Sequence, residues 1–401
     1  MNSLNKISVI IPVFNDRNLL EKALVAIDLQ ILLPHEVVIV DSSSEDEIKA
    51  YLDKSSFQFT VIYHKSPKRL FPYEASNLGV SLSSFNLIAF LDTKTIPKEN
   101  WLSTYLEIKI KKNADVVFGI TKYLAKSYFQ NLLRDSTYGR LGHETAPGSL
   151  ISKKDFLQAG PIMIGVRSGG DLEWRNRLKD SKYNCIIPKD IVLIYDELPN
   201  SLFKTLKQFF LYQMYGAKVN IQKNVKDLFL GLTLIFSAIL IPQWNGIVGW
   251  EDSPLYLPYI TRIYAISLVI ILMAYFIINR AIFRGLQSNF ILNAAKTIIF
   301  IFLFLAIFRW NEVLANWVEE SVWYVPNITK IYVTLIFLAS IFYRGLYFPY
   351  RNGVLIEDLF PLRWLQVGFL GLLLDLAKAP GYLLGSIMLP FIDNKSKQNK
   401  N

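Results

Sequence analysis

The chain has 401 residues, of which 52% are hydrophobic and 14% aromatic, and its formal net charge is +10. It is long enough for two domains, and its apolar fraction is too high for a purely soluble protein. A single cysteine, Cys185, excludes an internal disulfide framework, and the three histidines are too widely spaced for a zinc-ligand pattern.

The charged residues are unevenly distributed along the chain. The first half is dense in Lys, Asp and Glu, whereas the second half consists mostly of apolar runs. This asymmetry predicts a soluble domain followed by a membrane region. Much of the positive excess lies near the apolar runs, which favours attraction to anionic lipid headgroups over binding of nucleic acid. We expect no nucleic-acid partner and, because the first apolar run is short, no signal peptide.

Short apolar runs rich in β-branched residues alternate with helical patterns in the first part of the chain. The strands expected from these runs are residues 7–13, 36–41, 59–63, 87–91 and 115–120. Strands that alternate with helices predict βαβ units and a mostly parallel sheet.

Two of the expected strands end on an aspartate, Asp41 and Asp92. Ligands of open α/β sheets bind at the carboxyl ends of the strands. A carboxylate that follows five apolar residues, as Asp92 does, is better explained by a ligand or metal than by the core. An ordinary strand-ending aspartate is the alternative when this stretch is taken alone.

Four segments, residues 7–15, 38–46, 77–79 and 90–97, together resemble the nucleotide-binding half of a family 2 glycosyltransferase with the GT-A fold. The resemblance implies that Asp41 contacts the uracil or ribose and that Asp46 closes the same turn. The other residues implied to bind the nucleotide sugar are Pro12, Val13, Asn15, Asn77, Asp92 and Lys94.

The segment from Asp92 to Pro97 resembles the family's L-D-x-D-x-x-P motif, in which two carboxylates bind a divalent metal on the diphosphate. Asp92 is retained, but Lys94 replaces the second Asp. The resemblance implies Mg²⁺ or Mn²⁺ at Asp92, with water and phosphate oxygens as the other ligands. Alternatively, Lys94 lies on the phosphates and partly replaces the metal, or the site is degenerate and inactive.

Two later segments resemble the acceptor side of the family. Residues 146–156 resemble its acceptor-side strand, with a loop and an edge strand as the plainer interpretation. Residues 168–178 resemble its G-E-D motif, which implies that Asp171 is the general base of an inverting transfer. Asp171 as a simple helix cap is the alternative. The acceptor-side residues implied are Gly148, Gly169, Gly170, Glu173, Trp174 and Arg177.

The second half contains four apolar stretches that we interpret as transmembrane helices, at residues 228–243, 263–278, 290–308 and 328–348. Acidic residues lie in two of the connecting loops and arginines flank the third, which predicts a cytoplasmic catalytic domain. Residues 364–389 are also apolar, but Asp375 and Lys378 in their middle make a span costly. We therefore expect an interfacial or re-entrant helix there.

The sequence thus predicts an α/β domain of GT-A type followed by an all-α transmembrane region. The expected parts are a catalytic domain at 1–199, an interfacial amphipathic helix and linker at 200–226, four transmembrane helices at 227–348, and an interfacial or re-entrant helix with a Lys-rich tail at 349–401. The helix near residues 201–216 could instead pack in a protein core. We expect a multi-pass protein of a bacterial inner or plasma membrane.

The resemblance implies a hexosyl-type glycosyltransferase that inverts the configuration of its sugar. Its expected partners are a nucleotide-diphosphate sugar, a lipid-linked or membrane-associated glycan acceptor and membrane lipids. The alternative is a catalytically impaired binding or scaffold subunit of a glycan-assembly complex. That alternative is favoured by three departures from the family pattern, Ser76 for Arg, Lys94 for Asp and Gly170 for Glu.

Overall fold

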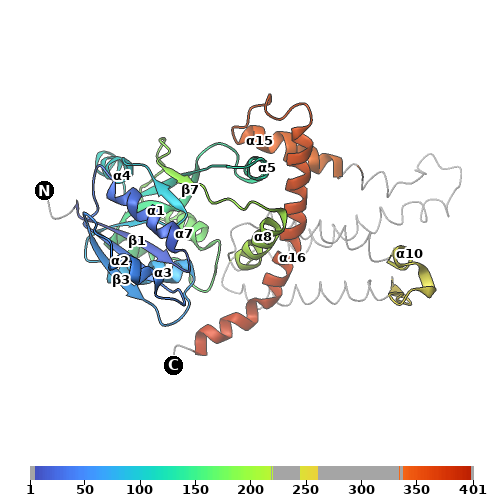
Figure 1. Cartoon of the computed structure of the whole chain (residues 1–401), viewed down its shortest axis with the longest axis horizontal. Coiled ribbons are helices and arrows are strands. Elements are labelled where there is room, and N and C mark those ends of the chain that lie inside the picture. Colours follow the sequence, from blue (N-terminus) through green and yellow to red (C-terminus); the bar gives the residue numbers. More distant parts are fainter. Residues whose placement is uncertain (1–4, 218, 220–243, 261–333, 335–336, 399–401) are drawn as a thin grey trace. The chain divides into compact units, whose positions relative to one another are not determined.

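The computed structural model describes residues 5–217, 219, 244–260, 334 and 337–398 (Figure 1). The chain divides into two compact units. The first contains Met1–Gln208, Val219–Ile221 and Arg344–Gly371, and the second contains Phe209–Lys218, Gln222–Tyr343 and Leu372–Asn401.

The first unit is built on a sheet of nine strands. These are β1 Ile7–Val13, β2 Glu36–Asp41, β3 Thr60–Lys65, β4 Leu87–Phe90, β5 Thr95–Pro97, β6 Val116–Tyr123, β7 His143–Ser152, β8 Cys185–Ile186 and β9 Leu193–Tyr195. The strand order is β3-β2-β1-β4-β7-β6-β9-β5, and β8 pairs with β6.

Helices separate most of the strands, and more helices follow them. They are α1 Arg17–Asp28, α2 Glu47–Leu52, α3 Pro72–Leu82, α4 Trp101–Lys111, α5 Tyr128–Thr137, α6 Lys153–Ala159, α7 Gly170–Asp180 and α8 Leu202–Gly216. Further along are α10 Trp244–Val248, a 3-10 turn at Trp250–Asp252, a π-helix at Tyr343–Tyr347, α15 Phe348–Arg351 and α16 Arg363–Gln398.

The prediction of a mostly parallel sheet is confirmed, although three of the strand pairings are antiparallel. Strands β3, β2, β1 and β4 are parallel, as expected from their βαβ connections. Strand β7, however, lies antiparallel between β4 and β6. It is therefore a central strand, and the plainer interpretation of residues 146–156 as a loop and an edge strand is wrong. Pro147 and Gly148 give this segment the composition of a loop.

Alternate residues of the strands face two separate hydrophobic layers, as the period of two in a strand requires. On one face, Val9 and Ile11 pack with residues of α1, α2 and α4. On the other face, Ile10 and Phe90 pack with residues of α3, α6 and α7. The unit is thus a three-layer α/β/α domain, and the predicted α/β class of the first domain is confirmed.

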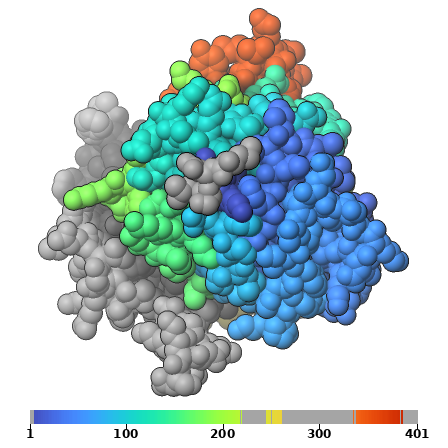
Figure 2. All heavy atoms as spheres, turned by 90° about the vertical axis from the view of Figure 1, so that its left-hand side faces the viewer, coloured from blue at the N-terminus to red at the C-terminus, as the bar shows by residue number. Residues whose placement is uncertain are grey.

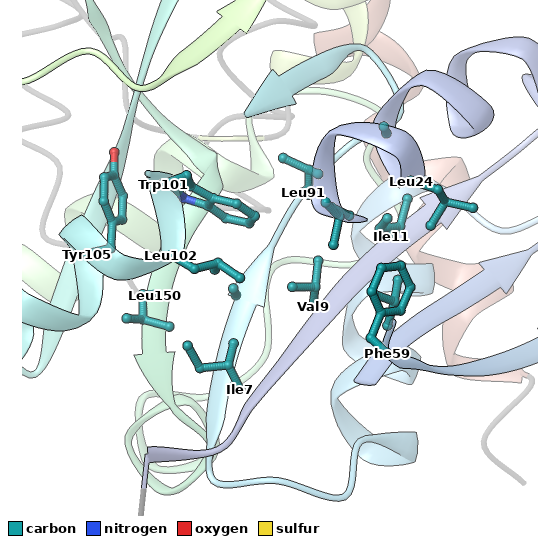
Figure 3. Packing of buried hydrophobic residues seen from close by; sticks show 14 of the residues in the cluster. Ile7, Val9, Ile11, Leu24, Phe59, Leu91, Trp101, Leu102, Tyr105 and Leu150 are labelled. Carbon is teal, nitrogen blue, oxygen red and sulfur yellow. The ribbon is translucent and has the colours of Figure 1, made fainter. Parts of the chain in front are cut away.

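The first of these layers shows how the helices are fixed to the sheet. In Figure 3, Trp101, Leu102 and Tyr105 of α4 lie against Ile7 and Leu150 of the strands. Trp101 is fully buried, and its indole N–H donates to the carbonyl oxygen of Gly148 at 2.9 Å. In the space-filling view of Figure 2, the blue, cyan and green segments of this domain pack against one another.

The predicted membrane region falls largely outside the described residues. This applies to 228–243, 263–278 and 290–308, and to 328–333 and 335–336 of the fourth stretch. Among the residues that the structure describes, no helix combines the length and the apolar character needed to cross a bilayer. The helices expected near 201–216 and 364–389 are present as α8 and α16, while their position at a membrane surface stays a prediction.

Candidate functional site

The parallel half of the sheet has a topological switch point between β1 and β4. The chain passes from β1 outward to β2 and β3 and then returns to β4 on the opposite side of β1. Ligands of open α/β sheets bind in the crevice at the carboxyl end of such a point. Val13 is paired with Asp41, and Ile10 with Phe90, so Asn15, Asp41 and Asp92 all lie at this carboxyl edge.

Asp41 is fully buried and is held by three neighbours. The backbone N–H of Ser43 donates to its Oδ1 at 2.8 Å, and the hydroxyl of Tyr63 donates to its Oδ2 at 2.8 Å. The ammonium group of Lys65 also contacts Oδ2, at 3.2 Å. Burial alone would raise the pKa of Asp41, but the hydrogen bonds from Ser43, Tyr63 and Lys65 lower that pKa below its usual value. Asp41 is therefore a fixed, ionised acceptor.

The turn after β1 is joined to the turn after β2. Asn15 has a φ of 54°, a left-handed conformation that asparagine tolerates well. Its backbone N–H donates to the hydroxyl of Ser43 at 2.7 Å, and its side-chain oxygen accepts from the N–H of Ser44 at 3.4 Å. Pro12 and Val13 lie within β1, so their contribution is to set the position of Asn15 beside Asp41.

Asp92 follows the end of β4 and is half-buried. The backbone N–H of Lys94 donates to its Oδ1 at 3.1 Å. Burial raises the pKa of Asp92, and the hydrogen bonds from Thr95 and Lys94 only partly offset that effect. A carboxylate that burial disfavours in its charged form gains stability when a cation binds it.

The fit of this edge to a divalent cation rests on Asp92 alone. In the described part of the chain, no group of three His, Cys, Asp or Glu side chains is close enough to hold a metal ion. Asp92 offers oxygen, which Mg²⁺ and Mn²⁺ prefer, but most of the remaining ligands must come from water or from the substrate. The charge of Lys94 acts on Asp92 without forming a direct ion pair between the two side chains.

Asn77 has a different surrounding from the one that the sequence implied. Its side-chain nitrogen donates to the carbonyl oxygen of Ile162 at 2.7 Å, and its side-chain oxygen accepts from the N–H of Ile162 at 3.0 Å. Both ends of the amide therefore hold the segment before α7, and neither end is directed to a diphosphate. In the same way, Ser76 bonds to its own helix at the carbonyl oxygen of Pro72.

Asp171 lies in the first turn of α7, after a glycine pair. Gly169 has a φ of 84°, so the chain enters this helix through a conformation that glycine adopts readily. The hydroxyl of Tyr73 donates to Oδ1 of Asp171 at 2.9 Å, and Arg175 approaches Oδ2 at 3.6 Å. The side chain keeps 24% of its surface exposed, so the carboxylate is held but accessible.

Packing brings the first turns of α7 against β4. The ring of Trp174 meets that of Phe90 edge-on at a centroid distance of 5.8 Å. Phe90 is two residues before Asp92, and Trp174 is three residues after Asp171. The helix that carries Asp171 therefore packs on the strand that leads to Asp92.

Most of the predicted acceptor-side residues support the fold in this structure. Trp174 is fully buried, so its side chain is not available to an acceptor. Glu173 and Arg177 form an ion pair at 2.8 Å, and Arg177 also donates to the carbonyl oxygen of Pro161. Gly148 has a φ of 87° and packs against Leu193.

Three side chains of the site were missed by the sequence analysis, namely Tyr63, Lys65 and Tyr73. The first two are separated by one residue on β3, so they share a face of the sheet beside Asp41. That spacing was visible in the sequence once residues 60–65 were taken as a strand next to β2. Tyr73 carried no comparable signal, since its partner Asp171 is 98 residues away.

Comparison with known proteins identifies the domain. The model of glycosyl transferase family 2 matches residues 8–168. Glycosyltransferase AglE of Haloferax volcanii is 28% identical over 209 residues, which cover 48% of this chain and 67% of that protein. The GalNAc(5)-diNAcBac-PP-undecaprenol beta-1,3-glucosyltransferase of Campylobacter jejuni is 31% identical over 157 residues, covering 38% of this chain and 48% of that protein.

Solved structures were also matched. The mannosyltransferase PcManGT from Pyrobaculum calidifontis, in complex with GDP-Man and Mn²⁺, has a TM-score of 0.41 and 19% identity, covering 53% of this chain and 63% of that one. TarS 1-349 of S. aureus, in complex with UDP-GlcNAc, has a TM-score of 0.39 and 14% identity, covering 62% and 78%. The family match and the curated relatives support a family 2 glycosyl transferase domain at residues 8–168, and the prediction that this protein is a glycosyltransferase is confirmed.

Proposed function

We propose that this protein is an inverting glycosyltransferase that moves one sugar from a nucleotide-diphosphate sugar to a lipid-linked or membrane-associated glycan. The observation that carries this proposal is the placement of Asp171. Its half-buried carboxylate is held by Tyr73 and Arg175, and its helix packs through Trp174 on Phe90, two residues before Asp92.

The donor binds at the carboxyl edge of the parallel strands. Asp41 accepts hydrogen bonds from the nucleoside, and the turn of Asn15 and Ser43 fixes its position. A buried acceptor that is already oriented by its neighbours loses little entropy when a ligand binds. The diphosphate then extends toward Asp92 and Lys94 at the end of β4.

We propose Asp92 as the protein ligand of a divalent cation, Mg²⁺ or Mn²⁺. When bound, such a cation stabilises the negative charge of the leaving diphosphate. Lys94, two residues further on, supplies a second positive charge in the same place. In the family pattern, a second carboxylate helps to hold the metal that stabilises the charge of the diphosphate. Here the ammonium group of Lys94 stabilises part of that charge directly.

In the transfer step, a hydroxyl of the acceptor attacks the anomeric carbon of the donor sugar. The bond from that carbon to the diphosphate breaks on the opposite face, which inverts the configuration. Asp171 accepts the proton of the attacking hydroxyl, as a general base does. Its first-turn position and its 24% exposure are what this role requires, namely a rigid carboxylate that an acceptor can reach.

The proposal of a lipid-linked acceptor has two supports. The relative from Campylobacter jejuni is named for an acceptor on undecaprenol diphosphate. The apolar stretches of the second half of the chain favour a multi-pass protein with its catalytic domain on the cytoplasmic face. A transferase that is anchored in the bilayer meets a lipid-linked acceptor by diffusion along one surface, which raises the effective concentration of that acceptor.

The test is transfer of labelled sugar into the lipid fraction of membranes that contain the full-length protein. A panel of nucleotide-diphosphate sugars is supplied one at a time, and membranes without the protein serve as the control. We expect one donor to label the lipid fraction, and the product linkage to have the anomeric configuration opposite to that of the donor. Labelling with retained configuration, or labelling only of soluble glycans, would contradict the proposal.

A further inference from the structure

We propose that Tyr73 of α3 is a positioning residue for Asp171 and that α3 holds the whole base-bearing segment in place. This inference rests on the proposed role of Asp171 as the general base. It concerns Tyr73, to which the family pattern assigns no role.

The hydroxyl of Tyr73 is the shortest contact of the Asp171 carboxylate. It donates to Oδ1 at 2.9 Å, whereas Arg175 is 3.6 Å from Oδ2. A phenol that donates to one carboxylate oxygen fixes the orientation of the plane of the two oxygens. Oδ2 is thereby left as the oxygen that accepts the proton of the acceptor hydroxyl.

The second observation is the glycine beside the base. A Cβ placed on Gly170 would lie 2.8 and 2.9 Å from two ring carbons of Tyr73. Real Cβ atoms are essentially never found so close to other atoms, so the ring of Tyr73 occupies the space that a side chain at position 170 would need. The family pattern has Glu at this position. Gly170 and Tyr73 are therefore a matched pair, in which the phenol supplies the polar group beside Asp171.

Two neighbours of Tyr73 on the same helix hold the segment before the base. Glu74 accepts from the backbone N–H of Gly165 at 3.0 Å, and Asn77 makes two hydrogen bonds to Ile162. Arg177 of α7 contacts the same segment at Pro161. Four side-chain hydrogen bonds from one turn of α3 thus hold both Asp171 and the chain that leads to it.

Helix α3 is in turn fixed to the strand that leads to the donor site. A Cβ on Gly79 would lie 2.4 Å from the side chain of Ile10 in β1, so the helix and the strand are packed at the closest distance that glycine permits. The position of Asp171 is therefore set by α3 relative to β1, whose end carries Asn15. A base held to within a fraction of an ångström is what efficient proton transfer needs.

The experiment uses the full-length protein in membranes and the transfer assay described above. The variant is Tyr73→Phe, which keeps the ring against Gly170 and removes only the hydroxyl. The matched control is Tyr128→Phe, which also removes one hydroxyl, in this case the partner of Gln366 on α16. We expect Tyr73→Phe to lower kcat about tenfold with a donor KM within about twofold of wild type, and Tyr128→Phe to change neither.

A second comparison tests whether Tyr73 acts through Asp171. Tyr73→Phe is combined with Asp171→Asn, and we expect no further loss beyond that of Asp171→Asn alone, because the group that Tyr73 positions is already removed. An unchanged kcat in Tyr73→Phe, or a change confined to the donor KM, would overturn the inference. Two other results would instead contradict the proposed function itself. They are wild-type membranes that transfer no sugar, and full activity of Asp171→Asn.

Discussion

The guanidinium group of Arg363 donates a 2.6 Å hydrogen bond to the carboxylate of Asp135, which lies 228 residues earlier in the chain. Asp135 is fully buried at the end of α5 and is also contacted by Arg134 at 3.0 Å and Arg140 at 3.6 Å. The segment Arg344–Gly371 thus belongs to the first unit, and the ion pair of Arg363 with the buried Asp135 fixes it there.

We predict that Asp135→Ala destabilises the protein strongly. Removing one partner of a buried ion pair leaves the other charges uncompensated, and the expected loss is about 3–5 kcal/mol in the free energy of unfolding. Denaturant unfolding followed by tryptophan fluorescence measures it. The control is the exposed Asp180, whose replacement by Ala should change the stability by less than about 0.5 kcal/mol. Equal effects of the two substitutions would contradict the role assigned to Asp135.

Asp41 should contribute to stability at neutral pH but not in strong acid. Its pKa in the folded protein lies below the value of 3.8 for the free side chain. A lowered pKa means that the unfolded chain binds the proton first, so the contribution is complete above pH 3.8 and is lost as the pH falls through the folded value. Unfolding of Asp41→Asn and wild type, compared from pH 7 to pH 2, should therefore show a difference that shrinks below about pH 4.

The matched control for this measurement is Asp46→Asn. Asp46 contacts the same Lys65 at 3.2 Å, but 83% of its side chain is exposed. Solvent screens such a pair, so this variant should resemble wild type at every pH. A pH dependence of Asp41→Asn that runs parallel to that of wild type would show that Asp41 is not the titrating group.

Asp92 should have the opposite effect. Burial raises its pKa, so the stability that it contributes is present below about pH 3.8 and is lost as the pH rises through the folded value. Without nucleotide or divalent cation, we expect Asp92→Asn to have a higher Tm than wild type at pH 7. A higher Tm is expected because residues that bind ligands often destabilise the protein when the ligand is absent. The same variant should lose transfer activity, because the proposed ligand of the cation is removed. A lower Tm would indicate a structural role for the Asp92 charge.

The relative roles of a cation at Asp92 and of Lys94 can be separated with a chelator. If Asp92 holds a divalent cation, chelation should reduce transfer at least tenfold and Mn²⁺ or Mg²⁺ should restore it. Lys94→Ala should then lower kcat by a smaller factor, and its loss should be partly recovered at higher cation concentration. Activity that survives chelation in wild type and is lost in Lys94→Ala would assign the diphosphate charge to Lys94 alone.

The parallel half of the fold could be predicted from the sequence because its strands are short, continuous apolar runs. Strand β7 has no such run, and a strand at residues 146–156 was expected only from the family resemblance. Its residues are stabilised by pairing with β4 and β6, which lie elsewhere in the sequence. The strand-end positions of Asp41 and Asp92 followed from the same apolar runs. The start of α16 was predicted to within one residue, but the helix continues to Gln398, nine residues beyond the expected end. The contact of Arg363 with Asp135 has no local pattern.

The resemblance to a known family predicted which residues belong to the site region, but not which neighbours those residues contact. It placed Asn77 correctly on α3 but not its partner Ile162, because the motif records which residue is present and not what it bonds to. Trp174 illustrates the same limit, since its place in a motif gave no sign that Phe90, Phe118 and Phe156 enclose it. Tyr73 became visible only through its hydrogen bond to Asp171.

The most direct test of the account is sugar transfer by Asp171→Asn beside wild type, with the donor that the panel identifies. The substitution keeps the size of the side chain and removes the proton acceptor, so we predict a fall in kcat of about 10²-fold or more with nucleotide binding intact. Activity undiminished in Asp171→Asn would contradict the account, because the proton of the acceptor hydroxyl would then be taken by another group.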